Sequence, residues 1–503
     1  MAGIAAGVSL RRLAICVGAA AAVLLIPATA GFTPNIRLTA AIGLLMAMLW
    51  LTEAVPLGLT ALAPLILFPL AGITSMEKAA APYANSAVFL FMGGFLVAAT
   101  FERWGLHLRL AYFALHHIGT RPRRVILAVM LVTGFLSMWI SNTATTLMMT
   151  PIAVAIATGL AGVGRSVTSS GRPDSAARAG EAMLLGVAYA ASLGGLGTPI
   201  GTPTNLIFFG AVRELFPAAK GVSFAQWMVF GIIYLVILLP ICWLIVIVTS
   251  RVGKGGTVTI EELGLKHPGP MTRAEKTALA LCCATALLWV FRADIELGSM
   301  HLPGWSSLLP NPKAINDATV AVVMAFAAFL IPVSKEQKLL EWEEFSRIPW
   351  DVLILFGGGF ALADTLESSG FSKYAGARLS FLGGWPPVLM IIVVCIVVTA
   401  LSELASNVAT ATTMMPIAAA LATSIGVHPF MLMLPAVLAA SSGFMLPVAT
   451  APNTIVYGTG YVRVRAMTRA GILLDLAAAV VITALMFTVI PWVLEINLLK
   501  PLK

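Results

Sequence analysis

Four long stretches of this chain contain no Asp, Glu, Lys or Arg: Val125 to Gly164, Ala182 to Val212, Gly221 to Ser250 and Leu404 to Val462. A helix of about 20 apolar residues crosses a bilayer, so each stretch has room for at least one membrane-spanning helix. Apolar residues make up 59% of the 503 positions and charged residues 11%, and a water-soluble chain of this length needs far more charge on its surface. The sequence therefore predicts an all-α polytopic membrane protein.

The basic residues give a formal net charge of +9, but they do not indicate a nucleic-acid partner. They lie in short loops between apolar runs, where the positive-inside rule places them on the cytoplasmic face. The five cysteines fall within apolar stretches without metal-ligand spacing, and we expect them to pack as small apolar side chains. These cysteines are Cys16, Cys242, Cys282, Cys283 and Cys395.

The N-terminal apolar run, residues 13–30, follows Arg11 and Arg12 and ends in small residues. This pattern fits either a cleavable signal peptide or a retained first transmembrane helix. We favour the retained helix, because this crossing is needed to leave the later basic loops on the cytoplasmic side. The N-terminus is then cytoplasmic, and the protein lies in the cell inner (plasma) membrane.

Apolar runs and basic loops together predict about 11 transmembrane helices plus two re-entrant helical hairpins. The first hairpin, 125–164, has basic residues on both sides, so it enters and leaves on the cytoplasmic face. A turn leaves about 17 residues for each arm, or roughly 26 Å at 1.5 Å per residue, although two complete spans fit the same topology. The second hairpin, 383–425, has a sparse basic flank, which favours entry from the outer face. Ten expected spanning helices are 13–30, 38–54, 57–73, 86–101, 182–212, 227–250, 277–291, 318–334, 352–366 and 473–494. The chain is expected to cross once more between the second hairpin and the basic loop at Arg463.

The two hairpins contain nearly the same sequence. Residues 136–153 read LSMWISNTATTLMMTPIA and residues 401–418 read LSELASNVATATTMMPIA. The repeat extends to Phe91–Phe95 and Phe356–Phe360, and later to Thr202–Asn205 and Thr450–Asn453. Because the hairpins are expected to enter from opposite faces, the repeats are inverted, which is typical of secondary transporters.

A Ser-Asn pair stands at the centre of each hairpin, at Ser141-Asn142 and Ser406-Asn407. A break in the helix at this depth is tolerated only where protein buries it or it lines a wet cavity. Freed carbonyls, hydroxyls and an Asn amide oxygen suit Na⁺, and the amides at the following helix start suit a carboxylate. The alternative, that these small residues only permit close helix packing, explains a single copy better than two matched copies.

A second break follows each hairpin, because neither Gly194–Pro203 nor Leu446–Pro452 can form a regular helix. No Arg or Lys occurs in the hairpins or in these breaks. The charge of an anionic substrate would therefore have to be neutralised by bound cations and helix ends, which is a physical reason to expect ion coupling.

Glu403 is a carboxylate inside the second repeat, and the matching position 138 is Met. It either supports a proton or cation site or braces the hairpin by hydrogen bonds. A cation channel or a cation/proton antiporter that uses Glu403 is the alternative from another class. A membrane-embedded enzyme is disfavoured, because the sequence contains neither an HExxH motif nor a nucleophile–base arrangement.

These motifs carry a family likeness. With the two Ser-Asn hairpins, the segments GTPIGTPTNLIF, FMLPVATAPNTIVYGTG and LFGGGFALADTLESSG resemble the divalent anion/sodium symporter family from about residue 38 to 494. The resemblance implies a homodimer whose protomers each contain a scaffold domain and a transport domain that moves as an elevator. Substrates in this family are di- and tricarboxylates or sulfate, and some members exchange dicarboxylates without Na⁺.

The resemblance also implies a division of the chain and a set of ligands. The division is 1–85 for N-terminal scaffold helices, 86–250 for the first repeat, 251–276 for a cytoplasmic loop, 277–350 for further scaffold helices and 351–503 for the second repeat. The first Na⁺ site would use Ser137, Ser141, Asn142 and Gly201, and the second would use Ser402, Ala405, Asn407 and Ala449. The substrate would contact Ser141, Asn142, Thr143, Thr202, Ser406, Asn407, Val408, Thr450 and Ala451. At Val408 many family members have Thr, so the choice of acid is left open.

The sequence thus predicts a secondary transporter that imports C4-dicarboxylates such as succinate, malate or fumarate together with Na⁺. The expected partners are the dicarboxylate, membrane lipid and a second copy of the chain, and no enzymatic activity is expected. Na⁺-independent dicarboxylate exchange, or transport of citrate or sulfate by the same fold, are the alternatives.

Overall fold

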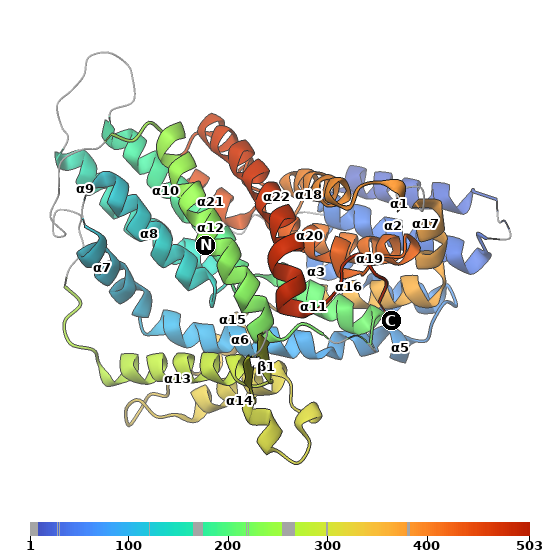
Figure 1. Ribbon diagram of the computed structural model, residues 1–503, viewed down its shortest axis with the longest axis horizontal. Helices are drawn as coiled ribbons and strands as arrows, with labels where there is room; N and C mark the ends of the chain where they lie inside the picture. The colour runs from blue at the N-terminus through green and yellow to red at the C-terminus, as the bar shows by residue number, and fades with distance from the viewer. Residues whose placement is uncertain are drawn as a thin grey trace.

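The chain is almost entirely helical (Figure 1). The computed structural model describes residues 9–27, 29, 31–119, 121–163, 175–217, 219, 221–253, 267–297, 300–379 and 383–502. Within this part, the only sheet is a two-stranded antiparallel one that pairs β1 (Ile295–Leu297) with β2 (Met300–Leu302), Ile295 opposite Leu302. The all-α class is therefore as predicted.

Long helices and short helices both occur in each half of the chain. The first half contains α1 (Leu10–Leu24), α2 (Pro34–Thr52), α3 (Leu57–Thr60), α4 (Ala63–Leu70), α5 (Met76–Ala80), α6 (Ser86–Arg103), α7 (Leu106–Ile118), α8 (Pro122–Ser137), α9 (Asn142–Val163), α10 (Ser175–Gly195), α11 (Pro203–Leu215) and α12 (Phe224–Thr249). The second half contains α13 (Arg273–Val290), α14 (Asp317–Leu330), α15 (Trp342–Arg347), α16 (Trp350–Ser368), α17 (Phe371–Leu379), α18 (Pro387–Leu404), α19 (Asn407–Ser424), α20 (Phe430–Ala440), α21 (Ala451–Gly458) and α22 (Val464–Leu494). Short 3₁₀ turns are η1 (Ala81–Ala84), η2 (Trp305–Leu308) and η3 (Pro312–Ala314).

Five helical stretches of the described residues are long and apolar enough to cross a membrane. They are Pro34–Thr52, Met76–Arg103, Phe224–Thr249, Pro387–Leu404 and Val464–Leu494. Leu57–Leu70, Asp317–Leu330 and Phe430–Ala440 are apolar but shorter, in part because breaks interrupt the apolar runs. These features agree with the predicted multi-pass membrane protein.

Several helix boundaries differ from those expected. The helix expected at 57–73 is two helices, because Pro64 lacks an amide hydrogen and lies at the start of α4. The run 182–212 is divided into α10 and α11 by the irregular residues 196–202. The last helix begins at Val464 instead of 473, since its polar first turns continue the apolar helix without a break.

The helices of the two halves are interrupted at matching positions in the repeated sequence. The breaks after α8 and α18 fall at residues 138–141 and 405–406, and the helices that follow begin at Asn142 and Asn407. The short helix after the second break of each half packs against the other half. Helix α11 packs against α19 and α20, and α21 packs against α9 and α10. Figure 1 shows α8–α10 on one side, α18–α20 on the other, and α12 and α22 between them.

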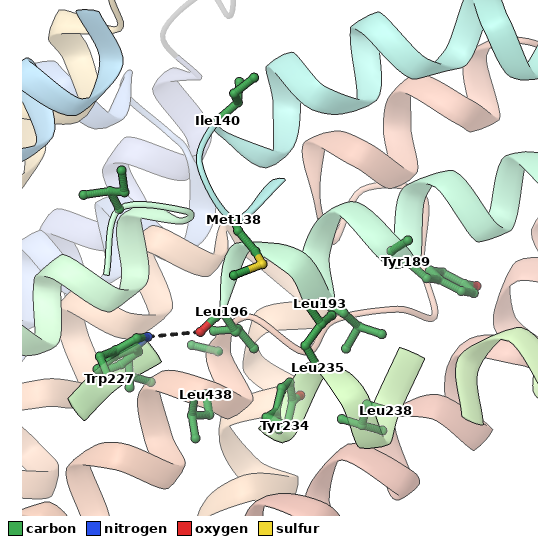
Figure 2. Packing of buried hydrophobic residues seen from close by; sticks show 14 of the residues in the cluster. Met138, Ile140, Tyr189, Leu193, Leu196, Trp227, Tyr234, Leu235, Leu238 and Leu438 are labelled. Atoms are coloured by element: carbon green, nitrogen blue, oxygen red, sulfur yellow. Dashed lines mark hydrogen bonds between the residues drawn. The ribbon is translucent and has the colours of Figure 1, made fainter. Parts of the chain in front are cut away.

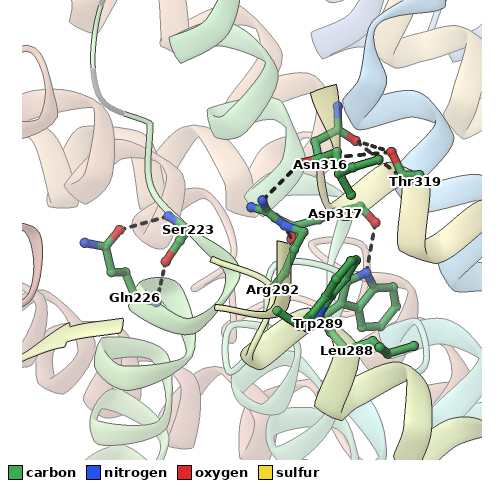
Figure 3. Close-up of polar contacts among 10 residues, drawn as sticks. Ser223, Gln226, Leu288, Trp289, Arg292, Asn316, Asp317 and Thr319 are labelled. Carbon is green, nitrogen blue, oxygen red and sulfur yellow. Dashed lines mark hydrogen bonds and ion pairs between the residues drawn. The ribbon is translucent and has the colours of Figure 1, made fainter. Parts of the chain in front are cut away.

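Polar caps fix where α12 and α14 begin (Figure 3). Ser223 and Gln226 form a reciprocal capping box at α12, in which each side chain accepts from the other residue's backbone amide. Asn316 caps α14, and beside it the Arg292 guanidinium pairs with Asp317 while the Trp289 indole donates to the Asp317 carbonyl at 2.9 Å. These contacts stabilise the first turns of both helices.

Candidate functional site

The amide of Asn142 lies at the centre of a cluster of oxygen atoms. Ser137 ends α8 and Asn142 begins α9, so the short turn between them brings both side chains to the same point. One atom of the Asn142 side-chain amide lies 2.8 Å from Ser137 Oγ, 3.1 Å from the Ala191 carbonyl oxygen and 3.3 Å from the Gly201 carbonyl oxygen. We call these four residues the first oxygen cluster.

The second half repeats this arrangement almost atom for atom. One atom of the Asn407 side-chain amide lies 2.7 Å from Ser402 Oγ, 3.1 Å from the Ala440 carbonyl oxygen and 3.3 Å from the Ala449 carbonyl oxygen. Ser137 and Ser402 are fully buried, so bulk water does not solvate either cluster from that side. We call Ser402, Asn407, Ala440 and Ala449 the second oxygen cluster.

The chemistry of each cluster follows from its atoms. If the amide nitrogen occupied the central position, it would donate to all three neighbouring oxygens. With the amide oxygen there, acceptors face one another, and a cation between them would relieve that repulsion. Hydroxyl, amide and carbonyl oxygens without a formal charge are the donor set that hard monovalent cations accept at broken helices.

Two asparagines hold the irregular segments that supply the carbonyl groups. Asn205 Nδ2 donates to the carbonyls of Gly195 (2.9 Å) and Thr198 (2.8 Å). Asn453 Nδ2 donates in the same way to Gly443 (3.4 Å) and Leu446 (3.0 Å). Both side chains are fully buried, so each segment keeps its irregular path through internal hydrogen bonds.

The two halves differ in how the hairpin is tied to the irregular segment. In the first half, the Thr198 hydroxyl donates to the Met138 carbonyl of the hairpin turn. In the second half, the Glu403 carboxylate accepts from the amides of Met445 (2.8 Å) and Leu446 (2.9 Å). Asp475 of α22 accepts from the neighbouring amide of Phe444 at 3.2 Å. Glu403 thus makes the bracing contacts expected of a structural carboxylate.

The remaining predicted residues lie around the clusters. Ser141 caps α9, with its hydroxyl accepting from Ala144 N at 3.3 Å, and Thr143 is exposed on the first turn. Thr202 is buried just before α11. In the second half, Ala405 and Ser406 form the break before α19, Val408 is half-buried, Thr450 caps α21 and Ala451 begins that helix.

A cavity of about 380 Å³ reaches one hairpin tip. Ser141 and Ala144 line it on one side, and Glu102, Arg103 and Arg347 line it on the other. Arg103 is paired with Glu344 at 2.8 Å and with Glu341 at 3.1 Å. The cavity therefore connects Ser141 of the first hairpin with charged residues of α6 and α15.

Sequence reasoning missed several residues of this site. The Ala191 and Ala440 carbonyl oxygens leave no signal in side-chain identity, because any residue carries such a group. Asn205 and Asn453 stand in the repeated segments singled out above, so their shared position was a usable signal. The proximity of Asp475 to Glu403 depends on how α22 packs, and no local motif indicates it.

The comparisons agree with these observations. The profile of the sodium:sulfate symporter transmembrane region matches residues 8–496. The sodium-dependent dicarboxylate transporter SdcS of Staphylococcus saprophyticus is 37% identical over 470 residues, covering 92% of this chain and 88% of that protein. SdcS of Staphylococcus aureus strain NCTC 8325 is also 37% identical over 470 residues, with 87% of its length covered.

Two solved structures share the fold at low sequence identity. The YdaH transporter of Alcanivorax borkumensis aligns with a TM-score of 0.55 at 14% identity, over 82% of this chain and 86% of that chain. MtrF of Neisseria gonorrhoeae aligns with a TM-score of 0.56 at 14% identity, over 84% and 83%. The profile match and the 37% identical relatives establish that the chain belongs to the sodium:sulfate symporter family, the divalent anion/sodium symporters, which are membrane transporters and not enzymes.

Proposed function

We propose that this protein is a secondary transporter that carries C4-dicarboxylates such as succinate, malate or fumarate together with Na⁺. The observation that carries the proposal is the pair of matched oxygen clusters at Asn142 and Asn407. The relatives of 37% identity support it, since both are named as sodium-dependent dicarboxylate transporters. Na⁺ is then a co-transported ion rather than a resident cofactor.

In this proposal each oxygen cluster binds one Na⁺. Ser137, Asn142 and Gly201 contribute to the first site and Ser402, Asn407 and Ala449 to the second, with Ala191 and Ala440 added from the geometry. Ser141 and Ala405 complete the sets that the family resemblance suggests. Each ion draws its hairpin tip and its irregular segment together, because both supply ligands.

The dicarboxylate then lies between the two tips. One carboxylate meets Ser141, Asn142, Thr143 and Thr202, and the other meets Ser406, Asn407, Thr450, Ala451 and the side chain of Val408. The starts of α9 and α19 offer unpaired backbone amides and a positive helix end to these anions. Two bound cations lower the remaining repulsion, which gives a reason for binding Na⁺ first.

Transport requires that the loaded site reach both faces of the membrane. We propose that the two repeats are inverted, that the hairpins are re-entrant, and that about 11 helices span the inner membrane with the N-terminus cytoplasmic. The helices α8–α12 and α18–α22 would form the moving transport domain of each protomer in a homodimer. The charged cavity at Ser141 would then be the route between the site and the cytoplasm, because charged residues of both signs from α6 and α15 line it.

The test is uptake of radiolabelled succinate into proteoliposomes, with an inward Na⁺ gradient or with choline, each with and without internal succinate. Na⁺-dependent uptake into empty vesicles supports the proposal. Uptake that ignores Na⁺ and requires internal succinate would make the protein an exchanger and remove both Na⁺ assignments. Competition by unlabelled malate, citrate and sulfate identifies the preferred anion.

A further inference from the structure

One helix, α12, contacts the irregular segments of both halves. Trp227, Gly231 and Tyr234 are spaced four and three residues apart, so they lie along one face of this helix. Trp227 and Tyr234 are buried, and Figure 2 shows the Trp227 indole directed at the Leu196 carbonyl with Tyr234 farther along the same helix.

The contact with the first half is made by Trp227 and Gly231. The Trp227 indole N–H donates to the Leu196 carbonyl at 3.0 Å, at the point where α10 gives way to the irregular residues 196–202. A Cβ atom at Gly231 would lie 2.6 Å from the Leu196 oxygen and 3.1 Å from the Gly197 oxygen. The helix therefore lies directly against the backbone of the segment that ends in the Gly201 carbonyl.

The contact with the second half is made by Tyr234. Ser442 Oγ donates to the Leu438 carbonyl at 2.8 Å, so the Tyr234 hydroxyl, 3.3 Å away, is the donor to Ser442 Oγ. Ser442 is buried and lies two residues after Ala440, whose carbonyl belongs to the second oxygen cluster. Thus one face of α12 contacts the backbone of the first irregular segment and a side chain two residues from a carbonyl of the second oxygen cluster.

We infer that α12 is a rigid connecting helix that couples the two ion-binding halves, with Trp227 and Tyr234 as positioning residues. This inference rests on the proposed function. When an ion orders the first irregular segment, Leu196 and Gly197 fix the position of α12, and Tyr234 transmits that position to Ser442. Coupling between sites is carried by such contiguous packed elements. The hydrogen bond between Thr204 Oγ1 and Ser441 Oγ, at 2.5 Å, is a second direct link between the halves.

The test measures Na⁺ dependence of succinate uptake in proteoliposomes for Trp227→Phe and Tyr234→Phe. Each variant is expected to raise the Na⁺ concentration for half-maximal uptake by about two- to tenfold, the range of one buried neutral hydrogen bond. The Hill coefficient for Na⁺ should fall, while uptake at saturating Na⁺ stays close to wild type. The double variant should shift Na⁺ dependence by less than the product of the single shifts, because both residues act through one helix.

Two matched variants control for ordinary structural damage. Trp243→Phe, on the same helix, removes an indole hydrogen bond to the Arg123 carbonyl (3.0 Å) that lies away from both segments. Tyr461→Phe removes a hydroxyl contact with Thr158 at 3.4 Å. Both should retain the wild-type Na⁺ dependence. The inference is overturned if Trp227→Phe and Tyr234→Phe also retain it, or if they lower only the maximal rate.

A second readout separates this inference from the proposed function. The melting temperature of the purified protein is measured against Na⁺ concentration without substrate. For both variants, the Na⁺ concentration that gives half of the stabilisation should rise by the same factor as in the uptake assay. Tyr234→Phe removes a single oxygen atom, so it decides the matter even if Trp227→Phe folds poorly. Wild-type uptake that does not depend on Na⁺ would overturn the proposed function itself. Na⁺-dependent wild-type uptake, with no change in the Na⁺ dependence of the two variants, would overturn only the inference about α12.

Discussion

The two halves of the candidate site have the same oxygen geometry but different supports. The distances around Asn142 and Asn407 agree to within 0.1 Å, at 2.8, 3.1 and 3.3 Å against 2.7, 3.1 and 3.3 Å. Yet a neutral Thr198 hydroxyl ties the first hairpin, while the Glu403 carboxylate ties the second through two backbone amides. The geometry of the oxygen clusters is therefore kept in both halves, while the bracing contacts differ.

The largest effect should come from removing the shared centre of each cluster. Asn142→Ala and Asn407→Ala each delete contacts with three oxygens, so succinate uptake should fall at least about 100-fold, which two charge-assisted contacts of about 1.5–3 kcal/mol each would account for. Uptake in proteoliposomes measures this, and size-exclusion profiles check that both variants still fold. Wild-type transport by either variant would contradict the site assignment and the equivalence of the halves.

Removing the bracing contacts of the two hairpins should affect Na⁺ dependence to different extents in the two halves. Glu403→Gln weakens two charge-assisted hydrogen bonds, so the Na⁺ concentration for half-maximal uptake should rise about 10- to 100-fold. Thr198→Val removes one neutral hydrogen bond from the first half and should raise it only about two- to tenfold. Equal effects would show that the carboxylate is no stronger a brace than the hydroxyl. Elimination of a pH-dependent cation flux by Glu403→Gln, without any succinate transport in wild type, would favour the channel or antiporter alternative.

A smaller effect is expected at the residue after each Asn. Thr143 in the first half corresponds to Val408 in the second, so at this position the two tips differ by one hydroxyl. Val408→Thr should lower the KM for succinate, and Thr143→Val should raise it, each by about two- to tenfold through one hydrogen bond. Initial rates over a succinate series at saturating Na⁺ measure both values. If neither KM changes, these side chains do not contact the substrate.

The smallest effect on uptake should come from the connecting helix α7. Arg109 donates to both oxygens of Glu275, at 2.6 and 3.0 Å, and to the Gly269 carbonyl at 2.8 Å, whereas on α17 the Arg378 guanidinium lies over Tyr374 of its own helix. Arg109→Gln should lower the melting temperature by a few degrees, about 2–4 °C for each kcal/mol lost, without changing Na⁺ dependence. Scanning calorimetry or dye-based melting measures this.

The same pair predicts a dependence on pH. The hydrogen bond from Arg109 lowers the pKa of the Glu275 carboxyl, before the apolar part of α13, from 4.5 to about 2. A lowered folded-state pKa stabilises the protein fully above pH 4.5, and that contribution is lost as the pH falls toward 2. The melting difference between wild type and Arg109→Gln should therefore shrink below pH 4.5. A constant difference across this range would show that the pair is not the cause.

The sequence by itself determined the class of this protein and the positions of its main helix breaks. Long uncharged runs require a membrane, and the duplicated Ser-Asn segments identified both hairpin breaks to within a few residues, because a helix break must be encoded locally. Ser137, Asn142 and Gly201, and their counterparts in the second half, lie close together, and their role as Na⁺ ligands stays a prediction. Glycine and proline likewise placed the irregular segments, since these residues disfavour regular helix.

Only the tertiary structure decided which backbone oxygens complete the clusters and what braces them. A carbonyl carries no side-chain identity, so Ala191 and Ala440 were invisible in the sequence. Contacts between Trp227 and Leu196, and between Asp475 and Phe444, join residues more than thirty positions apart, and their meeting depends on how α12 and α22 cross the two halves. Local sequence specifies where a helix breaks, whereas packing between distant helices specifies what each break contacts.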